Sequence, residues 1–199
     1  MKFRSIHIDT DRVLSLSAMV IGVGSLFVIL YQTHLMRQSQ HASVMPYLMI
    51  GFTSNSGGIH VNLRNAGIGP ALINDVRIRH ATGEKATDPY TFFLQGDANR
   101  RKLPLTVDSA VAGRLIPAGE GIQMVGVDGQ FLTDDRRGSM FKELLQTFDL
   151  AEVPSNWYEG VGLPAADPRR AVIEIVYSSI YGDRWRIRSN SFAPEPVRD

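Results

Sequence analysis

Hydrophobic positions follow two patterns along this chain, and the change falls at Pro46. Residues 13–31, VLSLSAMVIGVGSLFVILY, contain no charged side chain. At a rise of about 1.5 Å per residue, these roughly 19 residues make a helix of about 28 Å, close to the thickness of the bilayer hydrocarbon. The pattern predicts an N-terminal tail over 1–12, a transmembrane helix over 13–34 and a helical juxtamembrane extension over 35–45. Proline disfavours the helical conformation of the residue before it, so the extension ends there.

The apolar run is expected to remain as an anchor rather than to be cleaved as a signal peptide. A signal peptide has a shorter apolar core and a small-x-small cleavage site directly after it, whereas YQTHLMRQSQH offers none. Lys2, Arg4 and Arg12 precede the run, and only Arg37 follows it closely. By the positive-inside rule the N-terminus lies in the cytoplasm. The sequence therefore predicts a single-pass protein of the cell inner membrane whose soluble domain is periplasmic.

Small side chains lie at helical spacing within the predicted span. Ala18 and Gly22 are four residues apart, with Ser15 and Ser25 nearby. Small residues at this spacing let two membrane helices approach closely, which predicts a helix-packing face toward other membrane protein subunits or a second copy of this chain. Glycine and serine are also common in membrane helices that make no such contact, so this alternative stays open.

Beyond Pro46 the hydrophobic period changes to two. In GIHVNLRN, residues 58–65, Ile59, Val61 and Leu63 alternate with polar residues, as they do in a strand with one buried face. Further strands are predicted at 47–54, 74–80, 121–128, 171–181 and 184–192. Several short strands separated by turn residues favour a small antiparallel β-sandwich, so the predicted fold class is mainly β behind one membrane helix.

The predicted sandwich domain covers residues 46–192 and is interrupted by irregular insertions at 80–113 and 129–168. The second insertion carries one short amphipathic helix, with Ser139 as its N-cap. The i, i+3, i+4 and i+7 positions of that helix are Phe141, Leu144, Leu145 and Phe148. The remaining residues, 193–199, are predicted to form a frayed tail.

A hairpin is predicted at the last two strands, with Gly182 and Asp183 as a two-residue turn, because a tight hairpin needs positive φ at such a position. This register pairs Ile180 with Trp185. The predicted core face then holds Val176, Ile180, Trp185 and Ile187. The predicted outer face holds Arg184, Arg186 and Arg188 beside Tyr177 and Tyr181, an arrangement that suits cation–π contacts. A bulge at residues 178–179 would change the register.

The stretch RNAGIGPALINDV, residues 64–76, poses a choice between a phosphate-binding loop and a structural corner. A phosphate loop needs a helix after the glycines, because the helix N-terminus supplies the amides that bind the anion. Here Pro70 and an alternating strand pattern follow. The sequence therefore predicts a structural turn at Asn65, Gly67, Gly69 and Pro70. The two glycines are expected to adopt backbone angles that side chains forbid.

Composition removes several classes of function. The chain has 199 residues, a formal net charge of +1 and no cysteine. Near-neutral charge gives no reason to expect nucleic acid as a partner, and the lack of cysteine excludes disulfides and thiol chemistry. The five histidines are scattered, and the acidic loop at 128–135 lacks EF-hand spacing. No residue is therefore assigned to catalysis, a metal or a cofactor, and the chain is expected not to be an enzyme.

The strongest candidate for a binding face is the arginine set Arg184, Arg186 and Arg188. The neighbouring strands would extend this face if they adjoin, through Arg64, Arg77 and Arg79. Such a face suits lipid headgroups or an acidic partner. The alternative is an ordinary outer sheet face whose charge is balanced by Glu174 and Asp75.

Together, these motifs resemble those of a known group of proteins. LRNAGIGPA, IPAGE and VYSSIYGDRWRIRS follow one N-terminal membrane helix. The chain is similar to bacterial single-pass membrane proteins of unknown function with an N-x-G-x-G-P-A corner and a terminal Y-x-D-x-x-G hairpin. Residues Asn65, Gly67, Gly69, Pro70 and Ala71 match the corner. Tyr177 and Gly182 match the hairpin, where Ser179 replaces the usual acid. The resemblance implies an immunoglobulin-like sandwich and a membrane anchor, with no catalytic residue.

The expected function is a membrane-anchored, non-catalytic interaction module, an accessory or structural subunit of a membrane protein assembly. Its expected partners are membrane lipid and other membrane subunits or a second copy. The alternative is a membrane-tethered sensor or ligand-binding domain, in which the insertions at 80–113 and 129–168 form a pocket over the sheet. An anchored hydrolase is a third possibility, but no nucleophile-elbow motif supports it.

Overall fold

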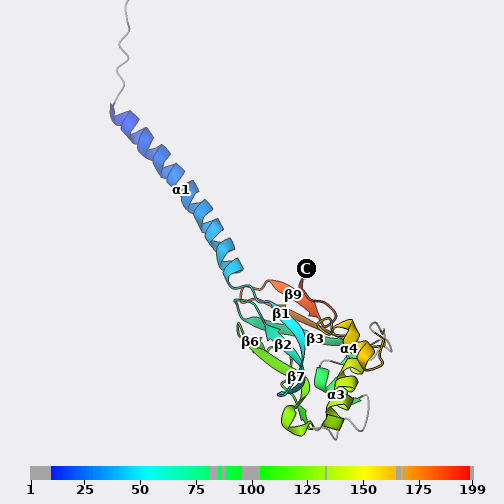
Figure 1. Ribbon diagram of the computed structural model, residues 1–199. Helices are drawn as coiled ribbons and strands as arrows, with labels where there is room; N and C mark the ends of the chain where they lie inside the picture. The colour runs from blue at the N-terminus through cyan, green and yellow to red at the C-terminus, as the bar shows by residue number, and fades with distance from the viewer. Residues whose placement is uncertain are drawn as a thin grey trace, which may run out of the picture. The chain divides into compact units, whose positions relative to one another are not determined.

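The computed structural model describes residues 10–80, 85–86, 88–95, 104–132, 134–164, 167 and 169–197. The chain divides into two compact units, one ending at Ser43 and the other beginning at Val44 (Figure 1). Lys2 and Arg4, on which the predicted topology depends, lie outside the described residues, as do most of the predicted N-terminal tail and the last two residues of the chain.

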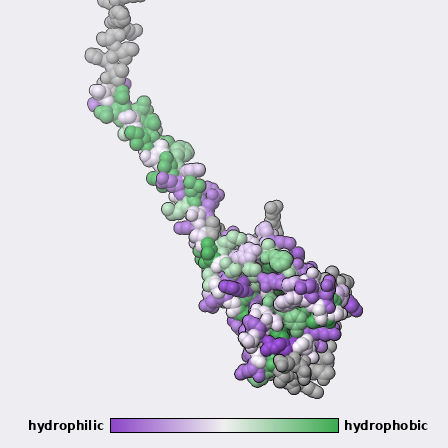
Figure 2. All heavy atoms as spheres, in the orientation of Figure 1, coloured by the Kyte–Doolittle hydropathy of each residue, from purple (hydrophilic) through white to green (hydrophobic). Residues whose placement is uncertain are grey.

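The first unit is the helix α1, which spans Thr10–Ser43 without interruption. The predicted transmembrane helix and its extension are therefore one element, and it ends three residues before Pro46. The stretch Thr10–Gln40 is long and apolar enough to cross a membrane, and its apolar window is not buried among the residues that the structure describes. Hydrophobic residues cover much of its surface in Figure 2.

The second unit, here called the β domain, contains two antiparallel sheets within the described residues. The first has the strand order β1-β2-β7-β5 and the second the order β10-β9-β8-β3-β4, with β6 paired to β3. The first sheet consists of β1 (Leu48–Asn55), β2 (Gly58–Asn65), β7 (Gly121–Asp128) and β5 (Leu105–Thr106). The second consists of β3 (Ala71–Arg79), β4 (Lys85–Ala86), β6 (Leu115–Ile116), β8 (Val172–Ser178), β9 (Arg184–Arg188) and β10 (Glu195–Pro196). The prediction of a mainly β domain behind an apolar helix is confirmed.

The two sheets contribute to one hydrophobic core, which explains the period-two pattern of their sequences. The side chains that alternate inward from β2, β3 and β8 are fully or almost fully buried: Ile59, Val61, Leu63, Ile73, Val76, Ile78, Ile173, Ile175 and Tyr177. Tyr177 joins the sheets directly, because its hydroxyl oxygen accepts a hydrogen bond from the backbone N–H of Leu48 at 3.3 Å. Burial raises the pKa of this phenol to about 12.

The described helices of the β domain lie in the two regions predicted to be irregular. They are α2 (Pro89–Gln95), the 3₁₀ turn η2 (Gly129–Phe131), α3 (Asp134–Thr147) and α4 (Ser155–Gly160). The predicted amphipathic helix corresponds to α3 but begins at Asp134, so Ser139 lies inside it and is not its N-cap. Leu144, Leu145 and Phe148 are fully buried, as their spacing predicted. Phe92 and Phe93 of α2 pack on Phe148 with ring centroids 6.0 and 6.4 Å apart.

The two-residue turn predicted between β8 and β9 is wrong. Tyr177 pairs with Trp185 and Ser178 with Arg184, so five residues, 179–183, form the connection. Ser179 closes this loop: its N–H donates to the Asp183 carbonyl at 2.9 Å and its Oγ accepts from the Tyr181 N–H at 3.2 Å. Gly182 has a φ of 89°, in the left-handed region that favours glycine.

The new register exchanges several side chains between faces. Tyr177 turns into the core and Ile180 is 59% exposed in the loop, whereas the prediction had them the other way round. Val176 pairs with Arg186 on the outer face. Trp185 and Ile187 do face the core, as predicted. The observed pairing of β8 with β9 differs from the predicted one by three residues. Because side chains alternate along a strand, this odd shift brings onto one face the residues of β8 and β9 that were predicted to lie on opposite faces.

Candidate interaction surfaces

The small-residue face of α1 is exposed over its whole length. Ser15, Ala18, Gly22 and Ser25 fall on one side of the helix, and each is exposed in the protein. A Cβ placed on Gly22 would have no neighbour within 4 Å. The Ser15 hydroxyl donates to the Arg12 carbonyl at 3.1 Å, so the helix itself satisfies this polar group in an apolar environment. The face therefore has open space and a satisfied hydroxyl, which suit close approach of another helix.

The predicted turn at GIGPA is organised by the side chain of Asn65, which is fully buried at the end of β2. Its Nδ2 donates to the carbonyls of Gly69 at 2.8 Å and Ile116 at 3.1 Å. Its Oδ1 accepts from the N–H groups of Tyr47 at 3.1 Å and Gly67 at 3.0 Å. One amide thus satisfies four backbone groups and ties together three segments: the entry to β1, the β2–β3 connection and the end of β6.

Gly67 and Gly69 are required for a reason different from the one predicted. Neither has a positive φ, so neither adopts a conformation that is closed to other residues. Instead, a Cβ on Gly69 would lie far inside van der Waals contact with the Val44 carbonyl, and a Cβ on Gly67 would collide with the backbone at Met45 and Tyr47. The glycines let the segment that follows α1 lie directly on the β2–β3 connection, where the Met45 carbonyl accepts from Ile68 N–H at 3.2 Å.

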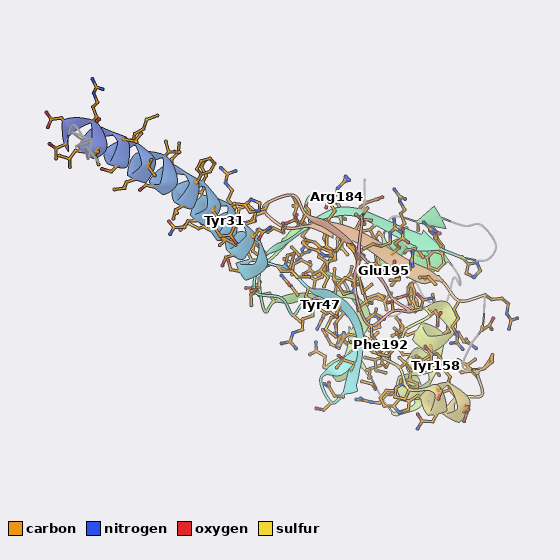
Figure 3. All side chains as sticks on the ribbon, turned by 90° about the horizontal axis from the view of Figure 1, so that it is seen from above. Tyr31, Tyr47, Tyr158, Arg184, Phe192 and Glu195 are labelled. Atoms are coloured by element: carbon orange, nitrogen blue, oxygen red, sulfur yellow. The ribbon has the colours of Figure 1, made fainter. Side chains whose placement is uncertain are left out.

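The arginine face is built around a carboxylate. Glu174 lies on β8 with only 2% of its side chain exposed. Arg79 reaches its Oε1 at 3.2 Å, Arg186 reaches Oε1 at 3.6 Å and Arg188 reaches Oε2 at 3.1 Å. Arg188 also contacts Glu195 of β10 at 3.4 Å. Figure 3 labels Glu195 and also Arg184, which begins the neighbouring strand β9. Three guanidinium groups therefore cover one buried carboxylate, an arrangement that compensates its desolvation.

The strand order extends this face toward the arginines of β3 but not toward Arg64 of β2. Because β3, β8 and β9 are neighbours, Arg77 and Arg79 join the three arginines of β9, and Arg77 pairs with Asp75 at 2.5 Å. Arg64 does not, because β2 belongs to the other sheet. The observed register turns Tyr177 into the core and away from the arginines of this face, contrary to the prediction. The ion pairs of Glu174 and Asp75 with these arginines favour the alternative, a charge-balanced outer face.

Sequence reasoning missed an aromatic groove at the end of the β domain where β1 finishes. Phe52 of β1 meets Phe141 of α3 with ring centroids 5.5 Å apart, and Trp157 of α4 lies 5.7 Å from Phe141. The groove has a volume of about 420 Å³ and is lined by Ser54, Phe141, Asn156, Trp157, Gly160 and Val161, with Phe52 packed behind Phe141 and Trp157. Trp157 is 40% exposed. No local pattern could have revealed it, because the three rings are far apart in the sequence.

A second, larger cleft of about 840 Å³ lies beside β3. Its described lining comes from β3 and from the segment that contains β4 and α2: Asp75, Arg77, Ile78, Arg79, Ala86, Asp88, Thr91 and Gln95. Asp88 caps α2 by accepting from the N–H and the hydroxyl of Thr91, while its other oxygen, Oδ1, is buried without a hydrogen-bond partner. The predicted pocket had included residues 129–168, and none of the described lining comes from there.

The remaining side-chain chemistry of the β domain includes two perturbed pKa values and no candidate metal centre within the described part of the chain. Among the described residues, no three histidine or carboxylate side chains stand close enough to hold a metal ion. Burial raises the pKa of Tyr158, whose hydroxyl hydrogen-bonds to Leu150 beneath the guanidinium of Arg170. Arg114 donates to Asp108 and lowers the pKa of that carboxyl. In comparisons with known proteins, no family model, curated protein or solved structure matches this chain.

Proposed function

We propose that this protein is a membrane-anchored, non-catalytic interaction module that serves as an accessory or structural subunit of a membrane protein assembly, or as a homo-oligomer. The proposal rests chiefly on α1, whose apolar stretch is not buried among the described residues and whose Gly22 has open space around it. An apolar helix of this length finds its stable environment in lipid, and a face of small residues favours a second helix against it.

The β domain supports the same proposal through the way its chain begins. Asn65 holds the N–H of Tyr47, and the two glycines of the corner admit the backbone of residues 44–47. The first residues of the β domain are thereby fixed on its own fold. We infer that the surface of this domain, outside the membrane, is where accessory contacts are made.

We further propose that the two sheets form an immunoglobulin-like sandwich, of the kind that the resemblance to the bacterial single-pass proteins implies. The support is topological. Constant-type immunoglobulin sheets have the strand orders A-B-E-D and C-F-G. If the letters A, B, C, C′, D, E, F and G are assigned in chain order to β1, β2, β3, β4, β5, β7, β8 and β9, the first sheet has the order A-B-E-D. The second sheet then contains the order C-F-G, and β4 lies on the outer side of β3 as C′ does beside C in variable-type domains.

The assembly proposal is tested by blocking the small-residue face. In the Ala18→Leu, Gly22→Leu double variant, two leucines fill the space that a partner helix would need. Wild type in mild detergent should elute as an assembly larger than the protomer, and the double variant should lose it. Val20→Leu is the matched control, since Val20 lies on the opposite side of the helix. A wild-type protein that is monomeric at all concentrations would overturn the proposal.

The proposed topology, a periplasmic β domain at the cell inner membrane, is tested separately. The support is the excess of basic residues before the apolar run. A reporter that is active only in the periplasm, fused after Asp199, should be active, and one that fluoresces only in the cytoplasm should be dark at the same position. The reverse pair of results would place the domain in the cytoplasm without affecting the assembly test.

The cleft beside β3 favours a second candidate, a membrane-tethered sensor or ligand-binding domain. Arg77, Arg79, Asp75 and Asp88 place both signs of charge around about 840 Å³, which suits a small polar ligand. Under this candidate, a compound that carries both charges should raise the thermal midpoint of the wild-type protein. The Thr91→Val variant, which keeps the side-chain volume, should abolish the shift if the ligand uses this wall. A shift that is the same in both proteins would argue against the cleft.

A further inference from the structure

The outer face of the first sheet carries a polar groove, separate from the cleft beside β3. The apolar residues of β2 point into the core, so Asn62 and Arg64, which alternate with them, lie on the opposite face. The strands β1 and β7 lie on either side of β2 (Figure 1). The groove has a volume of about 360 Å³, and its polar lining side chains are those of Thr53, Asn62, Arg64 and Gln123. This volume is in the range of small-molecule sites.

A β-bulge shapes the floor of this groove. Val61 of β2 pairs with Val125 of β7, whereas the next residue, Asn62, pairs with Gln123. Met124 is therefore the extra residue of the bulge. Met124 and Val125 are both fully buried, and Gln123 remains on the outer face beside Asn62. Bulges are over-represented next to active sites, where they re-aim a side chain, and this one sets two amide side chains next to each other.

Arg64 brings a positive charge to the groove. Its side chain is exposed and forms no hydrogen bond or ion pair with any residue that the structure describes. Its strand partner on β7 is Gly121, so no side chain fills the adjacent position. The carboxylate of Glu152 lies over Gly51, on the β1 side of Asn62. A guanidinium next to open space suits a carboxylate ligand, to which it can donate two parallel hydrogen bonds.

The other polar groups of the groove suit hydroxyl groups. The Asn62 Nδ2 donates to the Thr53 hydroxyl at 2.9 Å, which fixes the amide and leaves its Oδ1 available to accept. The Gln123 amide has no hydrogen-bond partner among the described residues and offers both a donor and an acceptor. Each hydroxyl of a sugar also donates and accepts, so two adjacent amides are complementary to a pair of sugar hydroxyls.

We propose that this groove binds a sugar acid, with the sugar carboxylate on Arg64 and two hydroxyl groups on Asn62 and Gln123. Charge and hydrogen bonding point to the same ligand, because a neutral sugar would leave Arg64 unused and a simple carboxylate would leave the amides unused. Glu152 repels a carboxylate from the β1 side, which orients the ligand toward Arg64. The site depends on neither the membrane anchor nor the assembly.

The test uses the full-length protein in micelles of a detergent without a sugar headgroup, which could otherwise compete for the groove. Binding of D-glucuronate is measured by saturation-transfer NMR, with D-glucose as the control for charge and acetate as the control for the hydroxyl groups. Glucuronate should bind at least about tenfold more tightly than either, because it alone combines a charge-assisted hydrogen bond with the amide contacts.

Three variants locate the ligand. Arg64→Leu should lower the affinity for glucuronate about tenfold, to that of glucose, and Gln123→Leu should weaken both sugars. Arg169→Leu is the matched control, since Arg169 is an exposed arginine elsewhere in the β domain, and it should change neither affinity.

Several results would overturn the proposal. A wild-type protein that binds no glucuronate would refute the site outright. Equal affinities for glucuronate and glucose would refute the role of Arg64, and equal affinities for glucuronate and acetate would refute a sugar. Binding that Arg77→Leu weakens and Arg64→Leu leaves unchanged would place the ligand in the cleft beside β3. None of these results bears on the oligomer or reporter tests of the proposed function.

Discussion

Replacing Asn65 by alanine should strongly destabilise the β domain, because this one side chain satisfies four backbone groups. The carbonyls of Gly69 and Ile116 are buried partners, whereas the N–H groups of Tyr47 and Gly67 are partly accessible to water. An unsatisfied buried polar group costs about 1–3 kcal/mol, so the two carbonyls and the partly hydrated amides together predict a loss of about 3–5 kcal/mol.

The matched control is Asn62→Ala on the same strand. Asn62 makes one side-chain bond, to the Thr53 hydroxyl at 2.9 Å, at a partly buried position. Its loss should cost about 0.5–1.5 kcal/mol. Urea unfolding of the full-length protein in micelles measures both, with tryptophan fluorescence as the signal. Trp157 and Trp185 are the chain's two tryptophans, and both belong to the β domain, so α1 contributes nothing to this signal.

A third variant separates the two halves of the Asn65 network. Asn65→Asp keeps the oxygen that accepts from Tyr47 and Gly67 but presents a second oxygen to the two carbonyls. The variant should therefore be less stable at neutral pH than in mild acid, where the protonated carboxyl can donate to one of them. If Asn65→Ala costs no more than Asn62→Ala, the corner does not depend on this amide and the reasoning fails.

Three further predictions use the same unfolding assay. Gly69→Ala should destabilise the β domain by more than about 2 kcal/mol, because the new Cβ would collide with the backbone of Val44. The control Gly138→Ala in α3, where the space is open, should stabilise it by about 0.5–1 kcal/mol. Similar effects of the two substitutions would mean that the close backbone approach at Gly69 is unimportant. Glu174→Gln should cost about 2–3 kcal/mol, since it leaves three arginines without their shared carboxylate, whereas the exposed Glu195→Gln should cost less than about 1 kcal/mol; equal costs would contradict the role of burial. The pKa of Tyr177 is raised to about 12 in the folded protein. Its contribution to stability is therefore complete below the pKa of the unfolded state, near 10, and is lost as pH rises through about 12. Tyr177→Phe should flatten this loss of stability, and an unchanged profile would assign the loss to other groups.

Elements with a local sequence signal could be predicted before the fold was known. An uninterrupted apolar run demands a long helix, whatever surrounds it, and period-two alternation demands a strand with one buried face. The range predicted for β2, residues 58–65, is the range observed, and so is that for β7, residues 121–128. The α3 helix was recognised from its buried spacing, although not from its first residue. The helix α2 has only seven residues, too few for a helical period of apolar positions to be recognised in the sequence.

Features that depend on the residues packed opposite a position were visible only in the tertiary structure. The sequence showed glycines at 67 and 69, but only the fold shows that the backbone of residues 44–47 occupies the space of their missing side chains. The five-residue loop after Ser178 reversed the faces predicted for Tyr177 and Ile180, because register follows from loop hydrogen bonds that no alternation reveals. The burial of Glu174 under three arginines likewise arises from strand order, which brings together residues that the sequence keeps far apart.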